Sequence, residues 1–197
     1  MLTKTPLTKT PRLTSARLIL RMGKPADIPA ILDYYEINRQ FLEPFEPQRP
    51  ADFYTASFWH SILEMRQQDF YEGHSIKLFI FEQAHPTAII GTLNLNSIVL
   101  GAFHGANLGY GLSAQKQGQG YMTEAGARIV TYAFDVLNLH RLMAAYMPHN
   151  HRSANVLKRL GFQIEGLAKD YLCIDGQWQD HVMTSLINPN WQTPEFS

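Results

Sequence analysis

The chain has 197 residues, of which 45% are hydrophobic and 17% are charged; this size and composition suit one globular domain with a sizeable core. Its 17 basic residues balance its 17 acidic residues, which argues against a large nucleic-acid-binding surface. The single cysteine, Cys173, excludes an internal disulfide, and no apolar run is long enough to cross a membrane. We therefore expect a cytoplasmic protein without a membrane partner.

The first segments predict a lead-in, a strand and a helix. Residues 1–16 are rich in Thr, Lys and Pro, which is typical of a flexible lead-in. Leu18, Ile19 and Leu20, followed by Arg21, predict the first strand. Pro25 opens a helix that continues through Tyr35, because proline is tolerated in the first turn of a helix.

The segment 38–47 is not periodic, and its prolines predict a stiff loop that displays Phe41 and Phe45. These two rings either line a pocket or fill the core between helices. The elements expected next are a helix at 52–70, a strand at 75–82, a turn at 85–87 and a strand at 88–100.

The second half continues the alternation of strands and helices, and its last strands form a hairpin about Asp175-Gly176, a favoured turn pair. The elements expected are a strand at 105–112, a helix after 120, a strand at 141–147, a helix at 150–160 and hairpin strands at 162–173 and 178–187. The order is that of a mixed α/β domain over residues 17–188, followed by a tail at 189–197.

The stretch from Gln115 to Gly120 lies where a predicted strand passes into a predicted helix. A helix start attracts phosphate oxygens through its unpaired N–H groups and its dipole, and glycines let a ligand approach the backbone. A dinucleotide fingerprint would need glycine at Thr123, and the chain lacks the Gly-Lys-Ser/Thr of a P-loop. Either the Gln-x-x-Gly-x-Gly stretch binds phosphates or it is an ordinary turn. The binding residues would be Gln117, Gly118, Gln119, Gly120, Tyr121 and Met122, bordered by the side chains of Gln115 and Gln119.

A second motif runs from Asn150 to Phe162 as an Asn-led helix that ends in Leu-Gly-Phe. Together with the stretch from Gln115 to Gly120, called the glycine turn below, this motif resembles the GNAT family of N-acetyltransferases. Members of that family carry an Arg/Gln-x-x-Gly-x-Gly/Ala turn for pyrophosphate. The part from Tyr146 to His181 is most similar to the bacterial ribosomal-protein N-terminal acetyltransferases. The resemblance covers roughly Arg17 to Ile187. It implies a GNAT fold: one mixed, mostly antiparallel sheet of about six to seven strands flanked by about four helices, splayed between the fourth and fifth strands.

The resemblance implies direct transfer of an acetyl group from acetyl-CoA to an amine in a ternary complex, without a metal. The implied acceptor is a ribosomal protein N-terminus, the alanine of the fifth small-subunit protein, free or in a small-subunit precursor. Two alternatives are a small-molecule amine as acceptor and a ribosome-assembly factor that acts by binding. The pair His149 and His151 could suggest a metal, but no third ligand has a supporting spacing.

The resemblance also implies roles for cofactor residues. The pantetheine arm would lie along Leu112 and Ser113 like an extra strand, with the Leu112 N–H as oxyanion donor. Asn150 and Asn155 would contact the cofactor, although asparagine at a helix start is equally a capping residue. On the acceptor side, the resemblance implicates Phe41, Phe45 and Tyr146.

The catalytic residues implied by the resemblance are Ser153 and Asp170. Family members often carry a tyrosine seven residues after the asparagine, but that position is Leu157 here. In the ribosomal-protein subgroup a serine three residues after the asparagine lies near the sulfur, which implies Ser153 as the proton donor to the thiolate. Asp170 aligns with the subgroup's acidic base, and a one-residue length difference leaves Tyr171 possible. Glu124 is a rival base, although an acid in a first helical turn already has an explanation in the helix dipole.

Overall fold

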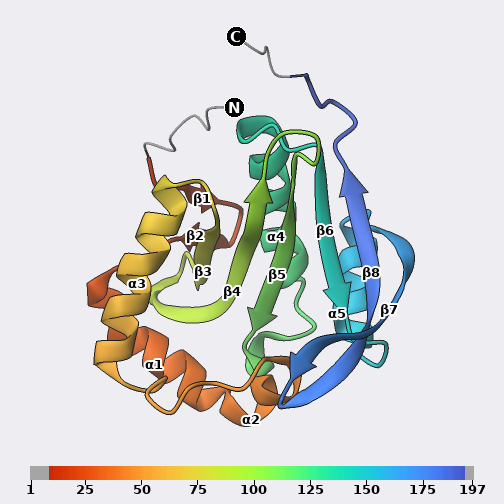
Figure 1. The fold of residues 1–197 in the computed structure, drawn as a ribbon. Coiled ribbons are helices and arrows are strands. Elements are labelled where there is room, and N and C mark those ends of the chain that lie inside the picture. The colour runs from red at the N-terminus through yellow and green to blue at the C-terminus, as the bar shows by residue number, and fades with distance from the viewer. Residues whose placement is uncertain (1–8, 194–197) are drawn as a thin grey trace.

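The computed structural model describes residues 9–193 and contains one eight-stranded sheet with helices on both faces (Figure 1). The spatial strand order is β1-β2-β3-β4-β5-β6-β8-β7, and all neighbours are antiparallel except β5 and β6. The predicted mixed, mostly antiparallel sheet is confirmed, with eight strands in place of the six or seven expected. The strands are β1 Arg12–Thr14, β2 Leu18–Arg21, β3 Ile76–Glu82, β4 His85–Val99, β5 Gly105–Leu112, β6 Arg141–Tyr146, β7 Gln163–Ile174 and β8 Gln177–Ile187.

Within residues 9–193, five α-helices, against the four or so expected, join the strands together with short helical turns. None of the helices in the described range is long and apolar enough to span a membrane. The helices are α1 Ile28–Ile37, α2 Arg39–Leu42, α3 Ala56–Tyr71, α4 Tyr121–Thr131 and α5 His151–Arg159. The short turns are η1 Pro25–Asp27, η2 Glu43–Phe45 and η3 Ala114–Lys116, with η4 Tyr132–Val136 as a π-turn that extends α4.

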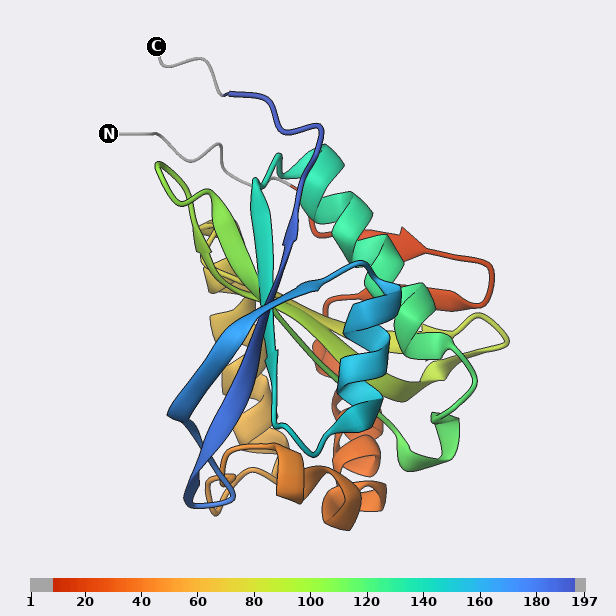
Figure 2. The same ribbon diagram turned by 90° about the vertical axis from the view of Figure 1, so that its right-hand side faces the viewer.

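The sheet separates two hydrophobic cores, with α4 and α5 on one side and α1 and α3 on the other (Figure 2). Strand β3 supplies both, because successive side chains of a strand point to opposite faces. Leu78 and Ile80 enter the core under α4, while Phe79 and Phe81 enter the aromatic core under α1 and α3. All four side chains are at most 1% exposed, so both faces of the central sheet are fixed by packing.

Strands β5 and β6 pair in parallel only where Gly105–Asn107 meets Arg141–Met143, and beyond these residues they diverge (Figure 1). On its other edge, β5 stays paired with β4 as far as Leu112. The predicted splay, between the fourth and fifth expected strands, is therefore confirmed. It leaves one edge of β5 facing an opening in the sheet rather than another strand.

Two local predictions were wrong. Residues 12–14, expected within the lead-in, form β1, because Leu13 pairs with Leu20 and is buried; residues 1–8 and 194–197 lie outside the described part. The turn expected at 85–87 lies at residues 83–84, since His85 already pairs with Glu82.

The expected stiff loop at 38–47 contains helix α2 and turn η2. Helix α1 begins at Ile28, because residues 25–27 form a separate 3₁₀ turn. Pro29 then lies in the first turn of α1, where its missing N–H has no helical partner to lose.

Candidate active site

The glycine turn joins the end of β5 to the start of α4 in the predicted order of strand, turn and helix. Gly118 has φ +73° and Gly120, the N-cap of α4, has φ +78°. Residues that carry a side chain rarely adopt this left-handed backbone conformation, so glycine at both positions permits the turn. A Cβ at Gly118 would have nothing within 4 Å. The backbone at Gly118 is therefore open to a ligand.

Two contiguous pockets lie between this turn, α5 and the α2–η2 segment. The first, the turn pocket, is lined by Leu112, Gln117, Gly118, Gly120, Tyr121, Met122, Thr123, Arg152, Asn155, Val156 and Arg159. The second, the aromatic pocket, is lined by Phe41, Leu42, Phe45, Glu46, Tyr110, Gly111, Leu112, Gln117, Met122, Asn150, Arg152, Ser153 and Val156. Leu112, Gln117, Met122, Arg152 and Val156 line both pockets. One continuous path therefore leads from the glycine turn to the aromatic side chains.

The turn pocket combines the start of α4 with Arg152 and Arg159 of α5. These arginines are seven residues apart and so lie on one face of their helix. The lining of this pocket, within the described residues, contains no acidic side chain. Positive side chains beside unpaired helix N–H groups make an anion site. Sequence reasoning missed both arginines, although their spacing on the Asn-led helix is visible in the chain.

The start of α5 fixes Ser153 in the aromatic pocket. Asn150 Oδ1 accepts a hydrogen bond from the Ser153 N–H at 3.1 Å, so the capping role of Asn150 is present. The Ser153 hydroxyl lies 2.8 Å from the Tyr110 hydroxyl, which also donates to the Ser153 carbonyl at 3.2 Å. Burial raises the pKa of Tyr110 to about 12, against the lowering effect of the Ser153 hydrogen bond. Tyr110 therefore stays protonated at neutral pH beside Ser153.

Comparisons with known proteins agree with this arrangement. The sequence profile of the acetyltransferase (GNAT) domain matches residues 17–163. The chain belongs to the GNAT family of N-acetyltransferases. It is 43% identical over 180 residues to the [ribosomal protein uS5]-alanine N-acetyltransferase of Escherichia coli K12, covering 91% of this chain and 92% of that protein.

Two solved structures share the fold of this GNAT enzyme over nearly its whole length. The ribosomal-protein-S5-alanine acetyltransferase of Vibrio fischeri has a TM-score of 0.87 and 36% identity, covering 93% of this chain and 100% of that one. RimJ of Mycobacterium smegmatis, solved in complex with CoA-disulfide, has a TM-score of 0.81 and 28% identity, covering 91% and 86%. GNAT enzymes use acetyl-CoA, and the expected GNAT fold is confirmed.

The remaining cofactor residues suggested by sequence lie close to the GNAT turn. Ser113 is buried, and its N–H donates to the Ile90 carbonyl at 2.8 Å. The Gln119 side chain donates a hydrogen bond to the Gln115 carbonyl at 3.1 Å, and this bond stabilises the turn. Asn155 lies in the lining of the turn pocket.

The predicted acceptor residues separate in space. Phe41 and Phe45 line the aromatic pocket with ring centroids 6.4 Å apart. Tyr146 is half-buried at the end of β6, packs against the core under α4 and lies outside the lining of both pockets. The two phenylalanines therefore lie where an acceptor could contact them, and the acceptor role of Tyr146 stays a prediction.

Asp170 lies in an irregular part of β7, between the paired residues Ala168 and Leu172. It has φ +45°, is exposed, and its N–H donates to Asp180 Oδ1 at 3.0 Å. It lines neither pocket among the described residues, and its role as a base stays a prediction. Neighbouring Tyr171 packs its ring against His181, with centroids 5.6 Å apart.

Glu124 accepts hydrogen bonds from the segment that precedes β2. Its carboxylate accepts from the Ser15 hydroxyl at 2.7 Å, the Arg17 N–H at 2.9 Å and Arg17 Nε at 2.7 Å. Partial burial would raise the pKa of Glu124, but these hydrogen bonds outweigh it and hold the pKa below its ordinary value. Glu124 also lies outside the lining of both pockets, as far as the described residues go. Glu124 therefore links α4 to the segment that leads into β2. This geometry does not support the alternative role of Glu124 as a catalytic base.

We expect Glu124→Gln to lower the free energy of unfolding by about 1 kcal/mol at neutral pH, a modest value because Arg17 is partly exposed. The folded pKa of Glu124 lies below the unfolded one, so its contribution is present above the unfolded pKa and is lost as pH falls through the folded pKa. Urea unfolding from about pH 7 to about pH 3 should show wild type and variant converging. A difference that persists at the acid end would contradict this. Glu43→Gln serves as the control.

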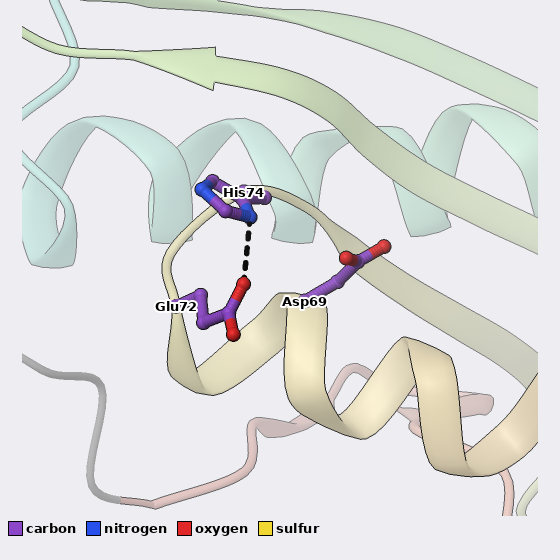
Figure 3. A group of neighbouring side chains, drawn as sticks. All are labelled: Asp69, Glu72 and His74. Atoms are coloured by element: carbon purple, nitrogen blue, oxygen red, sulfur yellow. Dashed lines mark ion pairs between the residues drawn. The ribbon is translucent and has the colours of Figure 1, made fainter.

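A group of possible metal ligands lies outside both pockets, at the end of α3. Ligand atoms of Asp69, Glu72 and His74 come within 4.8 Å of one another (Figure 3). Glu72 Oε2 and His74 Nδ1 are 3.1 Å apart and form an ion pair when His74 is protonated. His149, one of the histidines noted in the sequence, instead lies with its ring centroid 6.3 Å from that of Phe45. The group belongs to the end of α3 and is separate from the candidate active site.

Proposed function

We propose that this enzyme transfers the acetyl group of acetyl-CoA to the N-terminal alanine of ribosomal protein uS5, free or in a small-subunit precursor, in the cytoplasm. The observation that carries the proposal is the similarity to a uS5-alanine acetyltransferase along 91% of this chain. This span includes the glycine turn, α5 and the aromatic pocket together. A protein N-terminus also suits an aromatic pocket that is open rather than enclosed on every side.

In this proposal, acetyl-CoA occupies the turn pocket and the opening between β5 and β6. Its pyrophosphate meets the N–H groups of residues 118–122, with Arg152 and Arg159 beside it. The Gln117 N–H, which the sequence also suggested, already donates to the Ala114 carbonyl at 3.3 Å. The exposed edge of β5 then carries the pantetheine arm toward Ser153. The residues fit this ligand, because the glycine backbone is open and acidic side chains are absent from the described lining of the turn pocket.

The Leu112 N–H is assigned as the oxyanion donor. Backbone groups alternate between the two edges of a strand. The Ser113 N–H points to β4, where it bonds to Ile90, whereas the Leu112 carbonyl accepts from the Gln117 side chain at 3.1 Å. The Leu112 N–H therefore points toward the opening, where it would stabilise the charge that develops on the thioester oxygen.

Ser153 is assigned as the proton donor to the departing thiolate, in place of the tyrosine common in the family. Its hydroxyl lies in the aromatic pocket, within hydrogen-bonding distance of Tyr110. The Tyr110–Ser153 pair can replace a proton that Ser153 gives up. General acid catalysis of this kind contributes about 100-fold or more to a rate.

The test measures thiol release from acetyl-CoA with peptides that begin Ala-His-Ile or Ser-Ile-Lys, and with an N-blocked peptide that contains an internal lysine. Mass spectrometry then identifies the acetylated nitrogen. We expect acetylation of the α-amine of the alanine peptide alone. Turnover of small amines such as polyamines, without turnover of peptides, would overturn the acceptor. No turnover with any amine, together with tight binding to small-subunit precursors, would favour the assembly-factor alternative.

A further inference from the structure

The aromatic pocket contains a carboxylate that comes from the residue after η2. Glu46 shares the pocket lining with Phe45 and Ser153, and its side chain is 30% exposed. Among the described residues that line either pocket, Glu46 is the only acid. An amine that approaches Ser153 through this pocket therefore meets one negative charge, and that charge belongs to Glu46.

Arg49 forms an ion pair with the Glu46 carboxylate. Arg49 Nη2 lies 2.7 Å from Glu46 Oε2, and the arginine side chain is only 8% exposed. Its guanidinium lies over the rings of Tyr35 and Phe53, 4.8 Å from each centroid, and also donates to the Tyr54 hydroxyl. In the described part of the chain, Glu46 Oε1 accepts no hydrogen bond. One oxygen is thus fixed by a buried cation, and the other is available to a ligand.

The backbone of Glu46 is held by the far end of the chain. The Asp175 N–H, at the tip of the β7–β8 hairpin, donates to the Glu46 carbonyl at 3.0 Å, and Figure 1 shows this tip beside α2. A Cβ on Gly176 would come within 2.8 Å of the Gln48 side chain, so the hairpin packs tightly on this loop. The carboxylate is therefore oriented before a ligand arrives, which reduces the entropy lost on binding.

We propose, building on the proposed function, that Glu46 binds the α-ammonium group of the acceptor and takes its proton. The α-amino group of a peptide has a pKa of about 7.7 to 8.0, so much of it arrives charged at neutral pH. A carboxylate then serves twice: it attracts the ammonium group and it removes the proton that blocks attack. A free amine pairs with Glu46, whereas a blocked amine cannot.

With this assignment, every proton transferred in the reaction has a donor and an acceptor. One proton moves from the ammonium nitrogen to Glu46, and the neutral nitrogen forms a C–N bond with the thioester carbonyl carbon. The C–S bond then breaks, and the Ser153 hydroxyl gives its proton to the departing thiolate. The nitrogen loses its second proton, which restores Ser153 through the hydroxyl pair with Tyr110. Glu46 releases the first proton to solvent.

The alternative is that Glu46 only pairs with Arg49 to hold its loop. A comparison of two peptides separates the roles: the alanine peptide and the same peptide with its α-amino group replaced by hydrogen. Their affinities for wild type, Glu46→Gln and Glu43→Gln are measured with CoA bound. Glu43 is a fitting control, because it is a nearby acid that is 40% exposed, pairs with Arg39 and lines neither pocket.

We expect wild type and Glu43→Gln to prefer the amino peptide by at least about 10-fold, and Glu46→Gln to lose this preference. We also expect kcat/KM for the amino peptide to fall about 100-fold in Glu46→Gln. CoA affinity should stay at the wild-type value, because Glu46 lies outside the turn pocket. Tm should fall modestly, because glutamine still accepts a hydrogen bond from Arg49 but leaves the buried guanidinium without its negative partner. A loop-holding role alone would change both peptides equally.

Two results would overturn the inference: wild type with no preference for the amino peptide, or Glu46→Gln with the wild-type preference. In the second case, loss of the preference in Asp170→Asn would assign the role to Asp170. Affinity is measured without turnover, so it is independent of whether uS5 is the acceptor. A wild-type enzyme that prefers the amino peptide through Glu46 but acetylates only another amine would refute the proposed acceptor and leave the inference in place.

Discussion

Ser153→Ala is expected to lower kcat by about 100-fold and to leave acetyl-CoA affinity unchanged. The substitution removes the hydroxyl that lies 2.8 Å from Tyr110 in the aromatic pocket. It keeps the backbone N–H that Asn150 caps, so α5 should still begin at the same place. A loss that falls on kcat, with the Kd for acetyl-CoA preserved, is the signature of a group that acts in the transition state.

Steady-state thiol release and calorimetric titration of acetyl-CoA measure the two quantities. Ser61→Ala is the control, since Ser61 is an exposed serine on α3 whose hydroxyl bonds to the Ser57 carbonyl. Tyr110→Phe should give a smaller loss of about 10-fold, because it removes the hydrogen-bond partner of the Ser153 hydroxyl but keeps that hydroxyl. An unchanged kcat in Ser153→Ala would assign thiolate protonation to water or to the Tyr110 hydroxyl.

Arg152→Ala and Arg159→Ala should each raise the Kd for acetyl-CoA by about 10-fold, and the double variant by about 100-fold, because charge-assisted hydrogen bonds to phosphate contribute about 1.5–3 kcal/mol. Both side chains line the turn pocket beside the start of α4. The losses should shrink as salt increases, since both arginines are exposed and their charges are screened.

Calorimetry with acetyl-CoA, and with an acetyl-pantetheine fragment that lacks phosphates, tests this assignment. Lys158→Ala is the control, because Lys158 is an exposed cation on the same helix that lines neither pocket. The fragment should bind wild type and arginine variants equally. Arginine variants with wild-type affinity for acetyl-CoA, or with an equal loss for the fragment, would show that these side chains do not bind the phosphates.

Local sequence patterns were sufficient to predict the glycine turn and the start of α5, but not helix α2, which lies within the expected loop at 38–47. The glycines at 118 and 120 have the positive φ that the strand-to-helix turn requires, and Asn150 caps α5 as an asparagine at a helix start should. Such features depend on a few consecutive residues, so they are readable from the chain. The family resemblance added the mixed, mostly antiparallel character of the sheet and its splay, which no local pattern contains.

What the sequence by itself determined is therefore the family, the turn, the start of α5 and the position of Ser153. The tertiary structure alone decided which charged groups are available there. Glu124 is occupied by Ser15 and Arg17, more than one hundred residues away in the chain. Glu46 lines the aromatic pocket on a loop that bonds to the β7–β8 hairpin. The reason is physical: a carboxylate's role depends on its partners and exposure, and contacts between distant segments fix both.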